Sequence, residues 1–351
     1  MLSACGEGRG RSGGGGGGGP LKFWDQIWGS QAYIQAAKTL TEGYQPASGR
    51  PDATYQSIPW ANFVQTYSSA IASNTGPAVS SGAGYQALQF FDQGAIAPAD
   101  NLVSKLQGQD FLEGTIEPLK YQNQYVAVPW QLDIRALYYR KSLLEKAGAE
   151  IPTDWDSLKT ACAALNKIGV SGFGMCAASS TQIGSTQILS LMYNNGGGLY
   201  DAEGKPDCVT DRNIETVDFL KELGSTGAID KRYVSYTADN LTADLAAGKV
   251  GMLIHAPAQE ANLPAKDRDD LLVASPLTGP HGDKGTIYWI NNLMMYKNTP
   301  SQEDSEAFLA YYLDNMKVYW QKNVITALPV RQTIVDLPEF QENVTEVRGS
   351  W

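Results

Sequence analysis

Histidine and cysteine are scarce in this sequence of 351 residues, and their scarcity excludes several kinds of site. The chain has only two histidines, which nearly excludes a zinc site or a histidine-based catalytic triad. The four cysteines form no Cys-x-x-Cys pair and no metal-ligand spacing; they are Cys5, Cys162, Cys176 and Cys208. We therefore expect neither a metal nor a cofactor.

Positive charge and long apolar runs are also in short supply. Lys and Arg number 27 against 37 Asp and Glu, which gives a formal net charge of -10 and a pI near 4.8. Such an excess of negative charge repels phosphate backbones, so nucleic acid is excluded as an expected partner. No stretch reaches the roughly 20 apolar residues that a membrane-spanning helix needs.

Aromatic residues, by contrast, are plentiful, with 8 Trp and 18 Tyr among many Asn, Gln and Ser. This mixture suits sugars, because their C–H faces stack on aromatic rings while their hydroxyl groups need hydrogen-bond partners. Core packing is the alternative for any single Trp. It explains Trp155, since Leu158, Cys162 and Leu165 follow it at helical spacing.

Residues 1–20 differ in composition from the rest of the chain. The Gly-rich run over 6–19 has few side chains to bury, which predicts a flexible tether. Leu2-Ser3-Ala4-Cys5 resembles the lipobox of bacterial lipoproteins, in which the cysteine is acylated, so we expect a lipid anchor at Cys5. The alternative is a chance match, because no basic and apolar export segment precedes it. If Cys5 does carry an anchor, Met1 is an internal start or the chain is a fragment. If Cys5 is lipidated, the other three cysteines can form at most one disulfide.

Strand-like and helical patterns alternate after Pro20, which favours parallel sheets covered by helices on both faces. LKFW, ATYQSIPW and SGFGMC read as strands, and the stretches between them read as amphipathic helices. Thr153, three residues before Asp156, predicts a helix cap, and Gly169 predicts the end of that helix. Two long strand-like segments, 125–140 and 286–297, divide the chain where two sheets would be linked.

Six stretches, taken in chain order, resemble the extracellular solute-binding proteins of bacterial ABC importers, and specifically the carbohydrate-binding family that includes maltose-binding protein. They are LKFWDQ, IPWANFVQTYSSAIASNTGP, YVAVPWQLDIRALYYRKSLLEKAG leading into PTDWDSL, NNGGGLYDAEGKP, LAAGKVGMLIHAP and ALPVRQTIVDLPEF. The sequence departs from the family pattern at Ala78, where an acidic residue is usual, and at Ala258, where a Trp is common. It also ends at Trp351, some tens of residues earlier than is common.

The resemblance implies an α/β fold, two-lobed and periplasmic-binding-protein-like, with a ligand cleft between the lobes and a truncated C-terminal part. The segments around Asp133, Trp289 and Ala327 are expected to cross between the lobes, and hinge closure is the expected motion. The expected boundaries are 1–20 for the lipobox-like start and tether, 21–131 plus 290–325 for the first lobe, and 132–289 plus 326–351 for an incomplete second lobe.

Candidate ligand contacts follow the first strand and occupy the first crossing. Trp24, Asp25 and Gln26 are expected at the cleft mouth, because ligands bind at the carboxyl ends of parallel strands; a structural turn is the alternative. Trp130 is a candidate stacking residue. The resemblance implies that Asp133 contacts the ligand, as an acceptor for two adjacent hydroxyls, and an ion pair with Arg135 can coexist with that role.

Four further residues complete the predicted site. The resemblance implies a first-lobe contact from Tyr85 in SSGAGYQ, and Gln182 lies in a polar run at a predicted helix start in the second lobe. His255 ends the apolar strand GMLIH, where a core histidine would need a partner. Trp289 lies in the second crossing, either stacking on a sugar or packing between the lobes. The stretch DAEGKPD, despite calcium-like spacing of its acidic residues, predicts a hairpin turn because it lacks the full loop pattern.

The predicted function is extracytoplasmic binding of a mono- or oligosaccharide, and its delivery to ABC transporter permease subunits by a lipid-anchored monomer. Contact with the membrane is expected through the anchor alone. A glycan hydrolase is the main alternative, but Asp25 and Asp133 are the only candidates for the pair of carboxylates that it needs. A sugar-sensing or adhesion module is the third hypothesis.

Overall fold

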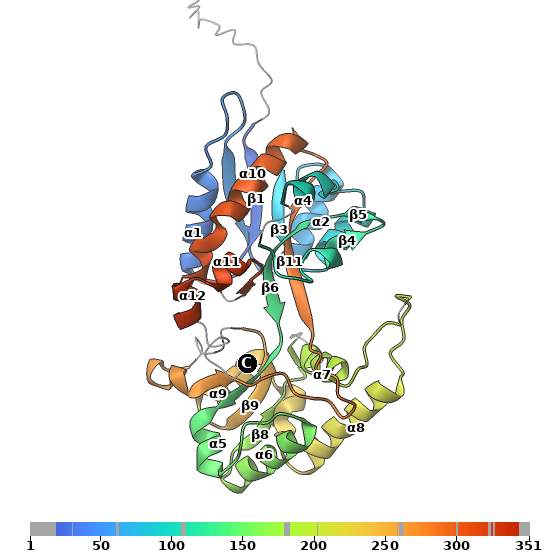
Figure 1. Ribbon diagram of the computed structural model, residues 1–351, viewed down its shortest axis with the longest axis vertical. Coiled ribbons are helices and arrows are strands. Elements are labelled where there is room, and N and C mark those ends of the chain that lie inside the picture. The colour runs from blue at the N-terminus through green and yellow to red at the C-terminus, as the bar shows by residue number, and fades with distance from the viewer. Residues whose placement is uncertain are drawn as a thin grey trace, which may run out of the picture.

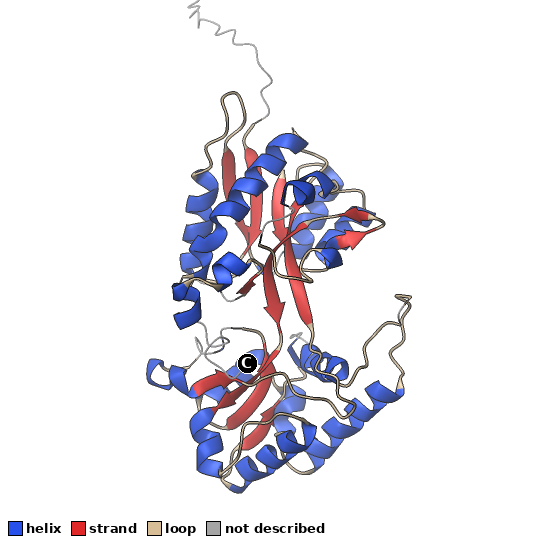
Figure 2. Cartoon of the chain, in the orientation of Figure 1, coloured by secondary structure: helices blue, strands red, loops and turns tan. Residues whose placement is uncertain are grey.

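The computed structural model describes residues 19–29, 31–60, 63–106, 110–178, 183–201, 203–257, 259, 263–299, 301–321, 324–325 and 327–343. The chain forms two lobes, each built around its own sheet, and strands β6 and β11 lead from one lobe to the other (Figure 1). Helices cover both sheets (Figure 2).

The first lobe contains strands β1 (Leu21–Gln26), β2 (Ala53–Ile58), β3 (Val79–Gly82), β4 (Lys120–Tyr121), β5 (Gln124–Tyr125), β6 (Val128–Ile134), β11 (Tyr288–Met295) and β12 (Leu328–Pro329). Its helices are α1 (Gln31–Glu42), α2 (Phe63–Ser73), α3 (Gln86–Asp92), α4 (Asp100–Leu106), α10 (Gln302–Asn315), α11 (Gln332–Val335) and α12 (Pro338–Asn343), with 3₁₀ turns η2 (Glu117–Leu119) and η6 (Met316–Trp320).

The second lobe contains strands β7 (Ala136–Arg140), β8 (Ser171–Gly174), β9 (Val250–His255) and β10 (Leu271–Val273). Its helices are α5 (Lys141–Ala147), α6 (Trp155–Lys167), α7 (Ile183–Asn194), α8 (Asp211–Ser225) and α9 (Ala238–Ala246), with 3₁₀ turns η3 (Lys231–Ser235) and η5 (Ala265–Asp270). Among all the described helices, none is long and apolar enough to cross a bilayer.

The two main sheets are mixed rather than purely parallel. The first-lobe sheet has the order β12-β6-β11-β3-β1-β2, and β1 runs parallel to both β2 and β3 as the alternating pattern predicts. The crossing strand β11 is antiparallel to β3 and β6, because the chain returns from the second lobe along it. The second-lobe sheet has the order β10-β7-β9-β8, in which only the β8–β9 pairing is parallel.

The segment over 125–140, predicted to pass from one sheet to another, does so at a single residue. β6 ends at Ile134 in the first-lobe sheet and β7 begins at Ala136 in the second-lobe sheet. Arg135 lies between them, and its backbone N–H donates to the Ile287 carbonyl at 3.0 Å. The two crossings are therefore joined side by side where the lobes meet.

Each sheet separates two buried clusters. In the first lobe, Phe23 faces α1 and α10 with Trp130, while Trp24 faces α2 on the other side. In the second lobe, Leu137 and Tyr139 face α5 and α6, while Tyr138 faces α9. This alternation is the expected consequence of side chains pointing to opposite faces along a strand.

The described end of the chain lies on the first lobe, contrary to the sequence-based boundary that assigns 326–351 to the second. Leu328 in β12 pairs with Leu132 of β6, and Val330, Ile334 and Phe340 are buried in the first-lobe core. Ala327 is therefore not at a crossing. Apolar side chains at 330, 334 and 340 supply the driving force that keeps this segment on the first lobe.

The cap of α6 differs by one residue from the sequence prediction. Asp154, not Thr153, is the N-cap, and its Oδ1 accepts a hydrogen bond from the Ser157 backbone N–H at 2.7 Å. Gly169 follows the helix with φ of +78°, as predicted for a residue that ends it. Asp is the stronger cap of the two, and Ser157 three residues later completes a capping box with Asp154.

Two further local predictions can be compared with the structure. The stretch DAEGKPD contains a tight turn, closed by a bridge between Tyr200 and Pro206, as predicted. Of the three cysteines that could share a disulfide, Cys162 and Cys208 are free thiols. Burial raises the pKa of the Cys162 thiol to about 12.

Trp130 is a core residue, and its replacement should destabilise the protein. Its ring is fully buried against Trp28, Tyr33 and Tyr319. We predict that Trp130→Ala lowers the free energy of unfolding by about 3–5 kcal/mol, measured by urea denaturation. The exposed Tyr200→Ala serves as the control and should change it by less than about 0.5 kcal/mol. Equal stability of Trp130→Ala and the parent protein would contradict this placement of the ring.

Candidate functional site

A cavity of about 710 Å³ lies between the two lobes, and we call it the interlobe cleft. Its size is within the range of pockets that hold small organic ligands. Both lobes and the first crossing contribute to its surface. The residues that line it are Ile27, Trp28, Gly29, Trp60, Phe63, Ala83, Tyr85, Asp133, Arg135, Ala256, Pro257, Trp289, Asn291 and Ala327.

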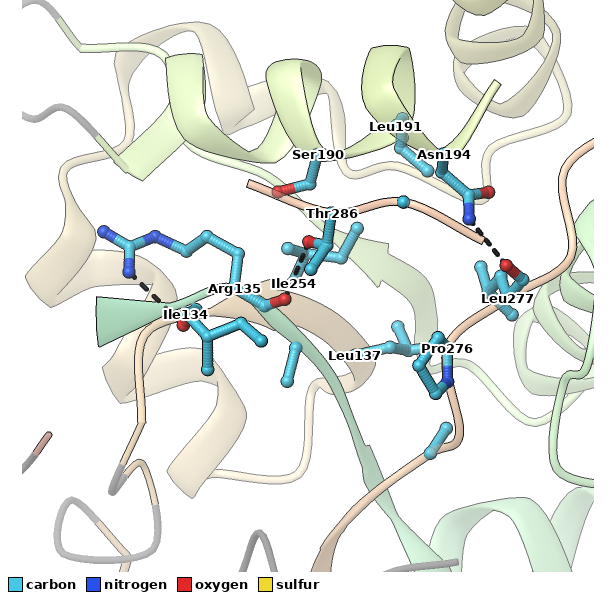
Figure 3. A pocket seen from close by; sticks show the side chains of 13 residues that line it. Ile134, Arg135, Leu137, Ser190, Leu191, Asn194, Ile254, Pro276, Leu277 and Thr286 are labelled. Atoms are coloured by element: carbon cyan, nitrogen blue, oxygen red, sulfur yellow. Dashed lines mark hydrogen bonds between the residues drawn. The ribbon is translucent and has the colours of Figure 1, made fainter. Parts of the chain in front are cut away.

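Two other cavities fit a ligand less well. One, of about 50 Å³, lies beneath the first crossing, where α7 contributes Ser190, Leu191 and Asn194 (Figure 3). It has room for water but not for a larger molecule. The other, of about 650 Å³, is a groove on the second lobe lined by Asp156, Glu215 and other carboxylates, and neither crossing reaches it.

Three aromatic residues of the first lobe form one side of the interlobe cleft, and we call them the aromatic wall: Trp28, Trp60 and Phe63. Their rings meet edge to face, with centroids 4.9 Å apart for Trp28 and Trp60 and 5.3 Å for Trp60 and Phe63. The Trp60 indole N–H donates to the Ile27 carbonyl at 2.7 Å, and 41% of its surface is exposed. A fixed and exposed indole is available for stacking on a ligand.

Hydrogen bonds connect the aromatic wall to the buried carboxyl group of Asp25 in the sheet. The Trp28 indole N–H donates to Ser81 Oγ at 2.9 Å, and Ser81 Oγ donates to Asp25 Oδ1 at 2.6 Å. Asp25 Oδ2 accepts from the Tyr33 hydroxyl at 2.7 Å. Burial raises the pKa of Asp25 to about 7, although the hydrogen bonds from Ser81 and the tyrosines oppose that rise.

The first crossing brings charge and an aromatic ring into the cleft together. Arg135 Nη1 donates to Asp133 Oδ1 at 2.5 Å, and the guanidinium lies 4.6 Å from the centroid of the Trp289 ring. Arg135 Nε also donates to Thr186 Oγ1 of α7 at 3.1 Å. The ion pair expected as an alternative for Asp133 is therefore present, and a third of the Asp133 side chain stays exposed.

The second lobe contributes a mostly apolar edge at the end of β9. Ala256 and Pro257 line the cleft, and His255 lies just behind them with 7% of its surface exposed. His255 Nδ1 accepts a hydrogen bond from the Ala256 backbone N–H at 2.9 Å. Burial and the nearby Arg135 charge lower the pKa of His255 to about 4, so this imidazole is neutral at pH 7.

The structure brings some of the predicted site residues to the cleft and not others. Tyr85, Asp133 and Trp289 line it. His255 adjoins it without lining it, and Gln182 lies outside the described residues, as does Cys5.

Trp130 on β6 packs in the first-lobe core and does not line the cleft, and Trp24, Asp25 and Gln26 are buried instead of exposed at the cleft mouth. The reason is that β1 runs two residues further than the predicted strand LKFW, and Gln26 still pairs with Ile58. The true end of the strand places Ile27, Trp28 and Gly29 in the cleft.

Sequence reasoning missed most of the aromatic wall. Trp28 follows β1 by two residues, while Trp60 and Phe63 follow the end of β2 at Ile58. The rule that ligands bind at the carboxyl ends of parallel strands applies to both strands. Applied to β2 as well as β1, it would have identified Trp60. Asn291 was missed because the pairing register that places it in the cleft is not readable from the sequence.

The comparisons with known proteins identify the family. A model of the bacterial extracellular solute-binding proteins matches residues 29–317, which is well over half of the chain. The chain belongs to this family, and the resemblance drawn from the six sequence stretches is confirmed. The members found in these comparisons are binding proteins rather than enzymes.

Solved structures of this class share the two-lobed fold. A sugar transporter from Arthrobacter chlorophenolicus A6, solved with bound laminaribiose, is 49% identical, with a TM-score of 0.81 and coverage of 92% of this chain and 82% of that chain. The GacH receptor of Streptomyces glaucescens GLA.O, solved unliganded and with acarbose, is 27% identical, with a TM-score of 0.76 and coverage of 93% and 83%.

More distant relatives are longer than this chain. A protein of Brucella abortus (strain 2308), named as a binding protein, is 24% identical over 276 residues, which are 78% of this chain and 66% of the relative. The chain thus spans two thirds or less of the length of the curated relatives that it matches, from 66% down to 35%.

The buried Asp25 carboxyl predicts a stability that falls as pH rises. Its pKa is raised from 3.8 to about 7 on folding, so the folded state favours the protonated form. This contribution is full below about pH 4 and is lost as the pH rises through 7, by up to roughly 4 kcal/mol. Asp25→Asn cannot titrate and should lack this loss. Urea unfolding of both proteins between pH 4 and pH 8 measures the difference, and parallel pH profiles would contradict the prediction.

Proposed function

We propose that this chain binds a neutral disaccharide in the interlobe cleft, with laminaribiose, a β-1,3-linked glucose disaccharide, as the first candidate. The observation that carries the proposal is the combination of the aromatic wall with Asp133, Tyr85 and Trp289 around one cavity of suitable size. Aromatic rings stack on the C–H faces of sugar rings, and carboxylate and hydroxyl groups pair with sugar hydroxyls.

The charge of the cleft supports a neutral ligand. Among the described residues that line it, Asp133 and Arg135 are the only charged ones, and they form an ion pair. An anionic sugar would meet the Asp133 carboxylate, while a cationic ligand would meet Arg135. A neutral sugar can donate to Asp133 and accept from Arg135 without leaving an unpaired charge.

The choice of disaccharide is supported by the transporter protein from Arthrobacter chlorophenolicus A6. At 49% identity over most of both chains, it was solved with laminaribiose bound. Function depends on the residues of a site rather than on the fold, so the linkage and length of the ligand depend on individual side chains. We therefore propose laminaribiose itself and treat other disaccharides as competitors to be measured.

Binding without catalysis is the proposed outcome. The hydrolase alternative required Asp25 and Asp133 as facing carboxylates, but Asp25 is fully buried and engaged by Ser81 and Tyr33. Within the described residues, Asp133 is the only carboxylate that lines the cleft. A glycosidase needs two such carboxylates.

We further propose that the lobes close by a hinge at Arg135 and present the sugar to the permease subunits of an ABC importer.

Stacking residues should account for much of the affinity. We predict that Trp60→Ala and Trp289→Ala each weaken laminaribiose binding by roughly tenfold to a hundredfold, since burying a sugar face on an indole is worth about 1–3 kcal/mol. Isothermal titration calorimetry measures the dissociation constants. Tyr288→Ala, on the residue before Trp289 and outside the cleft lining, is the matched control and should bind within twofold of the parent. Unchanged binding by both Trp variants would refute the stacking roles.

Asp133 separates a binding protein from an enzyme. In the proposed complex the Asp133 carboxylate accepts charge-assisted hydrogen bonds from sugar hydroxyl groups. Asp133→Asn should therefore weaken binding by tenfold or more. Asp156→Asn, in the groove of the second lobe, should leave binding unchanged. Incubation of the parent with laminaribiose for a day, followed by chromatography, should recover intact disaccharide. Cleavage by the parent that is lost in Asp133→Asn would show a hydrolase instead.

Attachment to the membrane is proposed through Cys5. When the full-length gene product is expressed in its host, mass spectrometry should find lipid on Cys5, and the protein should fractionate with membranes. Cys5→Ser should be released, because no other membrane attachment is proposed. Unmodified Cys5 in native protein recovered from the cytoplasm would contradict the anchor.

A further inference from the structure

The register of β6 and β11 places two amide side chains opposite each other beside the cleft. Gln131 pairs with Asn291, and Asp133 pairs with Trp289 two residues further along. Residues two apart on a strand share a face, so all four side chains lie on the same face of the sheet. Trp130 points into the core on the other face. We call Gln131 and Asn291 the cleft floor, because they continue inward from Asp133 and Trp289.

Three amide atoms of the cleft floor are buried without a hydrogen-bond partner among the described residues. Gln131 is fully buried, and neither its Nε2 nor its Oε1 is paired with a protein group. Asn291 has 3% of its surface exposed, lines the cleft, and has an unpaired Nδ2. Buried amides are paired in the large majority of cases, because an unpaired one destabilises the folded state. Functional sites commonly keep side chains that lower stability, because activity and stability trade off there.

A β-bulge distinguishes Asn291 from its neighbour. The pairing register shifts between Asn291 and Asn292, and bulges commonly redirect side chains next to a site. Asn292 Nδ2 donates to the carbonyls of Ala83 and Ile290, at 3.3 and 3.4 Å, so this amide is held by backbone. Asn291, one residue earlier, is directed to the cleft instead.

We propose that Asn291 binds a hydroxyl group of the sugar and that Gln131, directly opposite, is the positioning residue whose amide pairs with the Asn291 amide once the sugar is bound. An amide offers both donors and an acceptor, which matches a hydroxyl group that donates and accepts. Directly opposite side chains in an antiparallel pair are close enough for such contact. The inference rests on the proposed function, because it names groups that recognise the same neutral sugar.

The first test uses two measurements that should move in opposite directions. Gln131→Met and Asn291→Leu keep approximate shape but remove the unpaired polar atoms. Because a destabilising unpaired group is removed, each variant should melt roughly 2–4 °C higher than the parent. Each should also bind laminaribiose about tenfold more weakly. An ordinary structural role would instead lower the melting temperature and leave the affinity of the folded protein unchanged.

A buried glutamine of the second lobe supplies the matched control. Gln187 is fully buried, and its Nε2 donates to the carbonyls of Gly174 at 2.9 Å and Ile254 at 3.1 Å. Gln187→Met makes the same chemical change at a paired amide. It should lower the melting temperature and, while folded, bind laminaribiose within about twofold of the parent.

The second test identifies the hydroxyl. Each monodeoxy laminaribiose is titrated into the parent and into Asn291→Leu, with Asn291→Ser in its place if that variant does not fold. At one hydroxyl position the parent should lose about tenfold in affinity, while the variant loses none. Equal losses at every position, or parent-like binding by Gln131→Met and the Asn291 variant, would overturn this inference alone. A parent that binds no disaccharide at all would overturn the proposed function and this inference with it.

Discussion

The antiparallel pairing of β6 with β11 determines where the lobes meet and what lies between them. Both strands belong to the first-lobe sheet, yet each leads within a residue or two into the second lobe. Their register places Asp133 opposite Trp289 at the end of the two strands that lies nearest the second lobe, beside Arg135. A slip of one residue would turn these side chains to the other face, where the buried core around Trp130 leaves them no room. The core therefore enforces the register on which the cleft depends.

Buried polar groups support the cleft at a cost to stability. Asp25 is held under the aromatic wall by Ser81 and Tyr33, and Trp28 is oriented through the same Ser81 hydroxyl. An apolar residue in place of Asp25 would avoid the desolvation of a carboxyl group, but it would leave the Ser81 and Tyr33 hydroxyls without their acceptor. Gln131, opposite Asn291 on the neighbouring strand, is likewise a buried polar side chain that lowers stability. Asp25 and Gln131 thus both lower the stability of the first-lobe sheet next to the interlobe cleft.

The sequence predicted the fold class better than it predicted the individual contacts. Strand and helix alternation, together with the six family-like stretches, led to a two-lobed α/β fold, and the 125–140 segment does cross between two sheets. The contacts after β1 were displaced because the strand continues to Gln26, and strand ends are set by pairing with β2 rather than by local composition. The segment after Ala327 was assigned to the wrong lobe because apolar residues at Val330 and Ile334 fit either core equally well by pattern. Asp133 was placed in the cleft through the family resemblance, and Trp289 because a long strand-like stretch marks the second crossing.

The central claim is that a neutral disaccharide binds between the two lobes, and a crystal structure of the protein with laminaribiose tests it most directly. The account predicts electron density for one disaccharide in the interlobe cleft, with a sugar ring against Trp60 or Trp289 and a hydroxyl group within hydrogen-bond distance of Asp133. Density for the sugar only in the groove of the second lobe near Asp156 and Glu215, or an empty cleft at a sugar concentration that saturates binding in solution, would contradict it.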